Sequence, residues 1–299
     1  MDPAIIDGRR RGSLPLVMGL LLSVVLMAGC STMRLAYNQG QHMAYWWLDN
    51  YIDVTDEQSP QARDEISRWF RWHRATQLPA YAQSLAQLRQ EVLHDGTPAQ
   101  ACRWWGEVTR WRDLAAEHAL PAMADLALKL TPEQIEHLQN RYQKSNREFR
   151  KDHLQEDHEE RQQARLKRST ERAESLYGRL SPEQRQWLAQ RMAASPFDAE
   201  VSLRERQRRQ QDVLQTLRAL QAERPAVEQA RARVRELVHR LMNSPDAHYR
   251  SYHDKLTAFN CELVAQLHNR TTADQRQTAQ DKLHGWEKDL RALAAAAES

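Results

Sequence analysis

Glycine is scarce in this sequence, and few segments show the alternating apolar pattern of a β-strand. Of nine glycines in 299 residues, five follow residue 29, namely Gly40, Gly96, Gly106, Gly178 and Gly285. Runs of Val, Ile or Thr with period two are rare, whereas apolar residues often recur every three or four positions. The sequence therefore predicts an all-α fold.

Motifs that mark common active sites are also missing. No phosphate-binding glycine loop, nucleophile elbow or HExxH metal motif is present. With so few glycines, few tight loops can present backbone amides to an oxyanion. His153, Asp157 and His158 come nearest to a metal-ligand set, but only His153 and Asp157 share a helical face, and we interpret this stretch as solvated. We expect no enzyme, no catalytic residues, no metal site and no cofactor.

An excess of charge of one sign is absent as well. The chain has 43 basic and 40 acidic residues, of which three arginines and two aspartates precede residue 30. The remainder carries 40 basic and 38 acidic side chains and is close to neutral. A protein that binds nucleic acid would show a basic excess or stripe. We therefore expect no nucleic-acid partner.

One long hydrophobic run is present, and it lies at the amino terminus. Three arginines at positions 9–11 precede the uncharged stretch LPLVMGLLLSVVLMAGC, which ends at Cys30. About 16 apolar or small residues precede Cys30, fewer than the roughly 20 that span a membrane and typical of a secretory signal. The last four residues, Met27-Ala28-Gly29-Cys30, resemble the lipobox of bacterial lipoprotein signals. This resemblance implies that residues 1–29 are a signal peptide and that Cys30 is the site of lipid attachment.

The residue after the cysteine bears on the destination. Ser31 stands where an aspartate would retain a lipoprotein in the inner membrane, by resemblance to the sorting rule of enteric bacteria. Two or more acyl chains anchor a protein stably to a bilayer. We expect residues 30–299 to form an α-helical domain on the periplasmic face of the outer membrane, held there by N-terminal acyl chains. Its envelope protein partners are not specified by the sequence.

Two further cysteines, Cys102 and Cys261, lie within helical patterns. An oxidising periplasm permits a disulfide between them, and an even number is consistent with one. Buried free cysteines are also ordinary in helices. The sequence leaves both states open.

Helix starts are marked repeatedly along the chain. Capping boxes, in which a Thr or Ser side chain and a Gln three residues later cap the helix reciprocally, occur at 55–58, 97–100, 131–134, 181–184 and 272–275. Apolar residues at helical spacing between them predict a multi-helix bundle. Residues 144–174 contain 17 charged residues and almost no apolar ones, which predicts one long, highly charged and solvated helix.

Aromatic residues are concentrated in the first third of the chain. Seven of the nine tryptophans lie between residues 46 and 111, namely Trp46, Trp47, Trp69, Trp72, Trp104, Trp105 and Trp111. Adjacent helical residues point about 100° apart, so both members of an adjacent pair can be buried only in a wide core or at an interface. The cluster either forms a tryptophan-rich core or lines a groove for a peptide, a lipid or a partner helix.

The segment after the lipid cysteine combines polar and aromatic side chains, and we select it as a possible recognition segment. Its candidate residues are Tyr37, Asn38, Trp46, Trp47, Asp49 and Tyr51. The polar members either lock this segment onto the bundle through caps and hydrogen bonds or form a recognition surface.

Arg34-x-x-Tyr37-Asn38, followed by Leu48-Asp49-x-Tyr51 and by Thr55 with Gln58, resembles the amino-terminal signature of a family of uncharacterised proteobacterial lipoproteins, a domain of unknown function. The resemblance implies a helical lipoprotein of the outer membrane or periplasm and brings no catalytic residues. Leu130-Thr131-Pro132-Glu133-Gln134 and residues 180–184 also look like the Leu-Thr-x-x-Gln elements of periplasmic stress chaperones. We expect a non-enzymatic, chaperone-like or client-binding protein; the alternative is a scaffold lipoprotein with one fixed envelope partner, and an enzyme or lipid carrier is less favoured.

Overall fold

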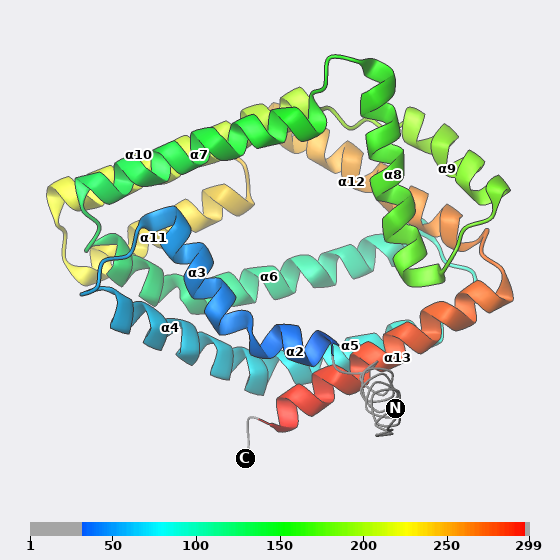
Figure 1. Cartoon of the computed structure of the whole chain (residues 1–299), viewed down its shortest axis with the longest axis horizontal. Helices are drawn as coiled ribbons and strands as arrows, with labels where there is room; N and C mark the ends of the chain where they lie inside the picture. Colours follow the sequence, from blue (N-terminus) through cyan, green and yellow to red (C-terminus); the bar gives the residue numbers. More distant parts are fainter. Residues whose placement is uncertain (1–31, 297–299) are drawn as a thin grey trace, which may run out of the picture.

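The computed structural model describes residues 32–296, and all regular secondary structure in that range is helical (Figure 1). The all-α prediction is therefore confirmed for this part of the chain. The predicted signal peptide, residues 1–29, and the predicted lipid-attachment site Cys30 lie outside the described residues. Between residues 32 and 296 no helix has both the length and the apolar character needed to cross a membrane.

The helices follow one another with short connections. Their bounds are α2 (Thr32–Asn38), α3 (Gly40–Ile52), α4 (Ser59–Trp72), the π-helical segment η2 (His73–Gln77), α5 (Leu78–Glu91), α6 (Pro98–Ala127), α7 (Pro132–His153), α8 (His158–Tyr177), α9 (Pro182–Ala193), α10 (Ala199–Glu223), α11 (Val227–Met242), α12 (Ala247–His268) and α13 (Ala273–Ala295).

The predicted capping boxes define helix starts. In α6, α7, α9 and α13 the Thr or Ser side chain accepts from the backbone amide of the Gln three residues later, and that Gln side chain accepts from the backbone amide of the cap. Thr55 and Gln58 make the same two hydrogen bonds in the turn just before α4. These starts follow from local chemistry, because each box satisfies amides that have no partner inside the helix.

The single long charged helix predicted for residues 144–174 is wrong. The charged stretch is divided between α7, which ends at His153, and α8, which begins at His158. Asp157 ends the connection as the N-cap of α8, its carboxylate accepting from the amides of Glu159 at 2.6 Å and Glu160 at 3.3 Å. The aspartate that caps α8 favours the start of a new helix there, although no glycine or proline marks the interruption in the sequence.

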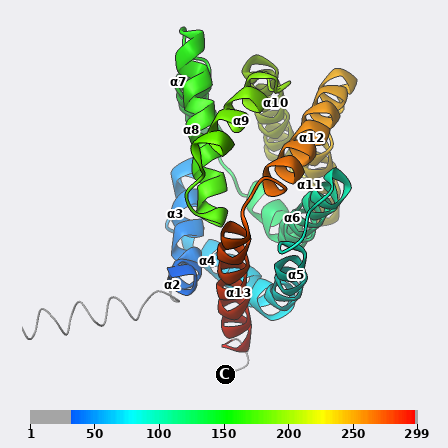
Figure 2. The ribbon, with the colours of Figure 1, turned by 90° about the vertical axis from the view of Figure 1, so that its right-hand side faces the viewer.

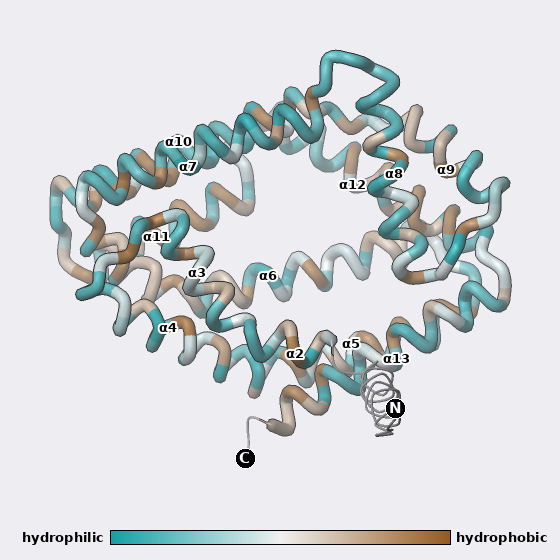
Figure 3. The backbone as a smooth tube through the Cα atoms, viewed as in Figure 1, coloured by the Kyte–Doolittle hydropathy of each residue, from teal (hydrophilic) through white to brown (hydrophobic). Residues whose placement is uncertain are grey.

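Helix α6 is central to the packing (Figure 1). Its first part lies against α12 and its last part against α11, while α13 packs along α5 and α10 along α7. Hydrophobic positions recur at short intervals along each helix between polar ones (Figure 3). Within residues 32–296 most buried hydrophobic side chains gather in three clusters, one between α6, α7, α10 and α11, one between α5, α8 and α13, and one between α8, α9 and α12.

Helices α4 and α5 form one rod that is interrupted by η2. Pro79 lacks a backbone N–H, so it cannot donate to the carbonyl four residues earlier. The helix widens at this point, and the amide of Leu78 donates to the carbonyl of His73, five residues before it. The widened turn carries His73 and Arg74, which both contact α2.

Candidate functional site

A groove with apolar walls lies between α3, α4 and α6. Its volume is about 490 Å³, within the range of roughly 300 to 1,000 Å³ usual for ligand sites. The apolar lining consists of Ala44 and Leu48 from α3, Ala62, Ile66, Trp69 and Phe70 from α4, and Ala119, Ala122, Met123 and Leu126 from α6. Met123 is 42% exposed, so an apolar side chain is presented to solvent at the groove. We call this feature the α3–α4–α6 groove.

Polar side chains lie along the edges of this groove. Gln61 accepts a hydrogen bond from the Lys129 ammonium group, and Glu65 pairs with Arg68. All four line the groove, with both signs of charge represented. The arrangement suits an apolar segment with polar flanks. The walls provide few partners for a charged group, whereas the edges can pair with positive or negative side chains.

Aromatic rings form the seam between α4 and α6 beside the groove. The Trp69 indole N–H donates to the Ala115 carbonyl at 3.0 Å, and the ring stacks on His73 with centroids 4.7 Å apart. Trp72 stacks on His118 at 3.8 Å. Among residues 32–296 no tryptophan is fully buried, and the cores are built mainly from leucine and alanine. Of the two interpretations of the tryptophan cluster, the structure therefore favours a groove-lining role for Trp69.

Burial sets the protonation state of the seam. It lowers the pKa of His73 from its usual 6.5 to about 4, so this imidazole is neutral at pH 7. Its Nδ1 is hydrogen-bonded to the Tyr37 hydroxyl at 2.9 Å, and burial raises the pKa of Tyr37 although Arg74 opposes the shift. A neutral pair is compatible with the low polarity around it.

Four of the six residues in the candidate recognition segment make contacts that hold it in place. Tyr37 contacts His73 as above, and the Asn38 side-chain carbonyl accepts from the Arg74 guanidinium at 2.9 Å. The Asp49 carboxylate accepts from the Val54 amide at 3.1 Å, just beyond the end of α3. The fourth residue, Tyr51, packs against the core cluster between α6 and α7. These contacts agree with the interpretation that the polar residues lock the segment onto the bundle.

The two tryptophans of that segment are placed differently. Trp46 is 65% exposed and Trp47 is 56% exposed, although Trp47 lies against Tyr51 with ring centroids 4.7 Å apart. Met43, one helical turn earlier, is 62% exposed. The candidate set therefore divides into four anchoring residues and an exposed apolar surface of α3 that the sequence could not separate from them.

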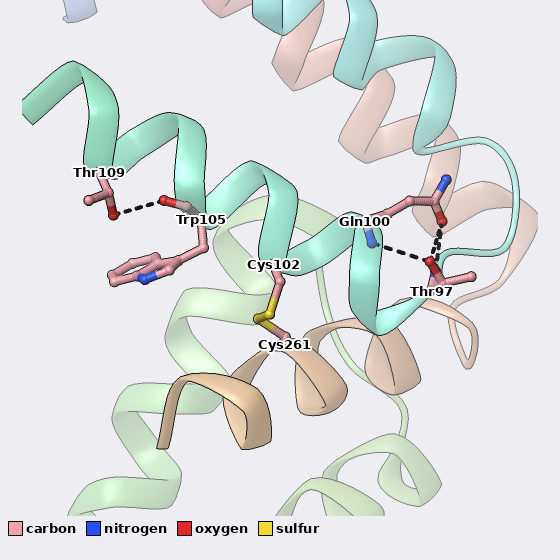
Figure 4. Close-up of a disulfide and its surroundings, with 6 residues drawn as sticks. All are labelled: Thr97, Gln100, Cys102, Trp105, Thr109 and Cys261. Carbon is pink, nitrogen blue, oxygen red and sulfur yellow. Dashed lines mark hydrogen bonds between the residues drawn. A yellow bond between two sulfur atoms is a disulfide. The ribbon is translucent and has the colours of Figure 1, made fainter. Parts of the chain in front are cut away.

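A disulfide joins α6 to α12 through Cys102 and Cys261, which are 159 residues apart in the sequence (Figure 4). Cys261 is buried. Trp105, one turn further along α6, is 52% exposed and lies on the same part of the helix as the bridge in Figure 4. The pairing that the sequence left open is thus present in the structure.

Four of the five capping boxes exchange hydrogen bonds in pairs, which the sequence alone did not reveal. The Gln134 amide donates to the Asp53 carbonyl at 2.8 Å and also contacts the Gln58 side chain. Gln58 reciprocates by donating to the Lys129 carbonyl at 3.0 Å.

The other pair repeats this pattern with Gln184 and Gln275. Gln184 donates to the Arg270 carbonyl at 2.7 Å, and Gln275 donates to the Arg179 carbonyl at 2.9 Å. In both pairs the accepting carbonyl lies two residues before the partner's capping residue. The repeated Thr/Ser-x-x-Gln spacing was the only sequence signal of this exchange.

The polar residues considered for metal binding have other roles. Asp157 caps α8, and the ring nitrogen Nδ1 of His153 lies 3.3 Å from the Arg168 guanidinium. Between residues 32 and 296 no group of three or more His, Cys, Asp or Glu side chains is arranged to hold a metal ion.

These features define an all-helical protein with paired capping boxes and an open apolar groove. Residues 50–250 match a family of unknown function (DUF6279), which is two thirds of the chain, and the protein belongs to this family. No curated protein and no solved structure matches the chain.

Proposed function

We propose that this protein is a lipid-anchored protein of the bacterial outer membrane, facing the periplasm, whose α3–α4–α6 groove binds an apolar helical segment of another protein. The groove is the observation that carries the proposal, because its apolar walls and mixed-charge edges match the two faces of an amphipathic helix. The role is binding and not catalysis.

The placement rests on the leader and on the cysteines. The run that ends in Met27-Ala28-Gly29-Cys30 supports acylation of Cys30, and in the sequence only Ser31 separates Cys30 from the first residue of α2. The disulfide between Cys102 and Cys261 supports an oxidising compartment such as the periplasm, since such bonds are rare in reducing cytosol.

Cell fractionation tests the placement. In cells that express the full chain, Cys30→Ser should leave the leader unprocessed or the protein mislocalised, whereas the unmodified chain should fractionate with the outer membrane. Acylated, outer-membrane Cys30→Ser protein would contradict the assignment of the lipid site.

A charge placed in the groove tests the binding site. A photo-crosslinking amino acid at position 119 of the full chain should capture a protein partner in intact cells, and Met123→Asp should reduce this capture at least tenfold. Leu114→Asp is the matched control, because Leu114 lies on the same helix, is also 42% exposed and does not line the groove. Equal capture by both variants would refute the groove as the site.

The same variants distinguish the favoured role from the alternative. If the protein is chaperone-like, the full chain suppresses aggregation of several unrelated unfolded clients and Met123→Asp abolishes the effect. If it is a scaffold, one partner is captured and aggregation is unchanged. The exposed Met43 and Met123 favour the first role, because methionine adapts its shape to different apolar surfaces.

A further inference from the structure

A second concave surface, which shares no lining residue with the groove, lies between α8, α9 and α12. Helix α9 packs against both α8 and α12, so it forms the base between them (Figure 2). The space has a volume of about 580 Å³, well within the usual range for small-molecule sites. We call it the α8–α12 cleft.

Three arginines line the α8 side of this cleft. Arg165, Arg168 and Arg172 are spaced by three and four residues and therefore share one face of the helix. Within residues 32–296 none of the three lies within ion-pair distance of a carboxylate, and the cleft lining contains no Asp or Glu. Elsewhere the arginines are often paired; Arg191 on α9, for example, lies 3.1 Å from Glu262.

The contacts that these arginines do make are weak or neutral. The Arg165 guanidinium lies 4.9 Å from the centre of the Phe197 ring. Arg168 donates to the Asp152 carbonyl at 3.4 Å and lies 3.3 Å from Nδ1 of His153. Burial, and then the positive charge of Arg168, lower the pKa of both Arg165 and His153. The α8 wall of the cleft therefore concentrates positive charge, and its guanidinium groups have N–H donors that pair with no carboxylate in the described part of the chain.

The opposite wall is mainly apolar, with Asn260 as the polar residue among those that α12 contributes. Leu256, Leu263 and Val264 lie on one face of α12, and Met192 of α9 extends this surface. Val264 is 55% exposed, which leaves an aliphatic side chain in contact with solvent at the cleft. A ligand that satisfies both walls must combine negative charge at one end with an apolar chain at the other.

We propose that the α8–α12 cleft binds a single-chain anionic amphiphile. Its carboxylate or phosphate monoester accepts hydrogen bonds from Arg165, Arg168 and Arg172, and its acyl chain lies along Leu256, Leu263 and Val264. Guanidinium groups bind both head groups through paired, charge-assisted hydrogen bonds. A nucleic acid or an acidic peptide carries charge along its whole length and would leave the α12 wall unpartnered.

Photolabelling of the full chain in phosphatidylcholine vesicles tests the proposal. Three probes with the same twelve-carbon, diazirine-bearing chain are compared, ending in a carboxylate, a phosphate monoester or an uncharged alcohol. At least one anionic probe should label peptides of α9 or α12 tenfold more than the alcohol does, and the better of the two identifies the head group. Equal labelling by the alcohol, or labelling elsewhere only, would overturn the proposal.

Substitutions test the contribution of each wall of the cleft to binding separately. Arg165→Gln with Arg168→Gln should reduce anionic labelling at least tenfold, and Val264→Trp should block the chain without changing the charge. The matched control is Arg112→Gln with Arg204→Gln, which removes the same charge from exposed positions outside the cleft. An unchanged helical circular dichroism signal and an unchanged urea midpoint in each variant report that the fold is retained. The proposal fails if neither cleft variant lowers labelling, or if the control lowers it equally.

Discussion

Aromatic rings fill the contact between α4 and α6, whereas the contact between α10 and α11 combines an apolar core with ion pairs at its edge. Trp69 and Trp72 fill the first seam by stacking on histidines. In the second seam Arg240 pairs with Asp212 at 2.7 Å across the two helices. Beside the aromatic seam, half-buried rings lie next to an open groove. In the ionic seam, the charged side chains of the two helices pair with each other. The comparison indicates that the aromatic side of the molecule is the better suited to accept an apolar partner.

A buried carboxylate of α10 lies beside this seam and pairs with two arginines of the same helix. Glu205 is 4% exposed, accepts from Arg208 and Arg209 at 2.8 Å each, and is also hydrogen-bonded to the Ser244 hydroxyl. Burial acts to raise the pKa of Glu205, but the hydrogen bonds from the two arginines outweigh it and hold the pKa below its usual 4.5. The carboxylate is therefore ionised at neutral pH, and its partners depend on it.

Removing the disulfide that joins α6 to α12 should have the largest effect on stability. Cys102→Ser with Cys261→Ser releases α6, which carries the aromatic seam, from α12. For cysteines 159 residues apart, chain-entropy arguments give a loss of about 4 to 5 kcal/mol in the free energy of unfolding. Urea denaturation measures it, with the reduced unmodified protein expected to match the variant. A loss below about 1 kcal/mol would show that packing alone holds α6 against α12.

Removing the buried carboxylate of α10 should have the next largest effect. Glu205→Ala leaves Arg208 and Arg209 without their carboxylate, and we expect a loss of about 2 to 4 kcal/mol, since both arginines are partly exposed. Glu200→Ala on the same helix is the control, because Glu200 is exposed, and it should change stability by less than about 1 kcal/mol. If the two variants behave alike, the buried Glu205 cluster does not contribute to stability.

The paired capping boxes allow a further comparison, between a glutamine that bonds to another box and one that caps only its own helix. Gln134 is 4% exposed and bonds across to another box, whereas Gln100 is exposed and caps only its own helix. Gln134→Ala should therefore lower the unfolding free energy by about 1 to 3 kcal/mol, and Gln184→Ala by a similar amount. Gln100→Ala should stay near 0.5 to 1 kcal/mol. Chemical denaturation of the three variants decides whether the exchange between boxes matters.

Mild acid should affect the aromatic seam before the ionic one. The folded-state pKa of His73 is about 4 against a usual 6.5, so the unfolded chain binds its proton first and stability falls as pH drops from 6.5 towards 4. Glu205 contributes stability that is lost only below about pH 4.5. Because His73 is partly exposed, we expect only about 1 kcal/mol, or a Tm lower by about 2 to 4 °C at pH 5 than at pH 7.

His73→Phe isolates this contribution. It should flatten the pH dependence between 7 and 5, because phenylalanine keeps the stack on Trp69 and cannot be protonated. His42→Phe, at an exposed position of α3, should leave the pH dependence unchanged. An unaltered Tm difference in the His73 variant would assign the acid sensitivity to another group.

The sequence predicted only part of the candidate site. The concentration of tryptophan near residues 46–111 lies in the part of the sequence that supplies the α3 and α4 walls of the groove, and Asp49 and Tyr37 lock the first helices in place. The exposure of Trp46 and Trp47 could not be foreseen, because a helical pattern does not say which neighbour covers each face. The sequence predicts that the arginines of the α8–α12 cleft belong to a solvated face. Nothing in the local sequence shows that α12 places an apolar wall opposite them.

The amino-acid sequence by itself determined the helical class and the helix starts, because these depend on bonds within a few residues, such as those between Thr131 and Gln134. Only the tertiary structure decided which capping boxes exchange hydrogen bonds and that Cys102 of α6 pairs with Cys261 of α12. It also decided that the charged stretch is interrupted before Asp157. Gln134 and Gln58 are 76 residues apart, and no local preference specifies that contact. It forms because packing of the amphipathic helices brings distant segments together, and the energy of that packing is shared over the whole chain.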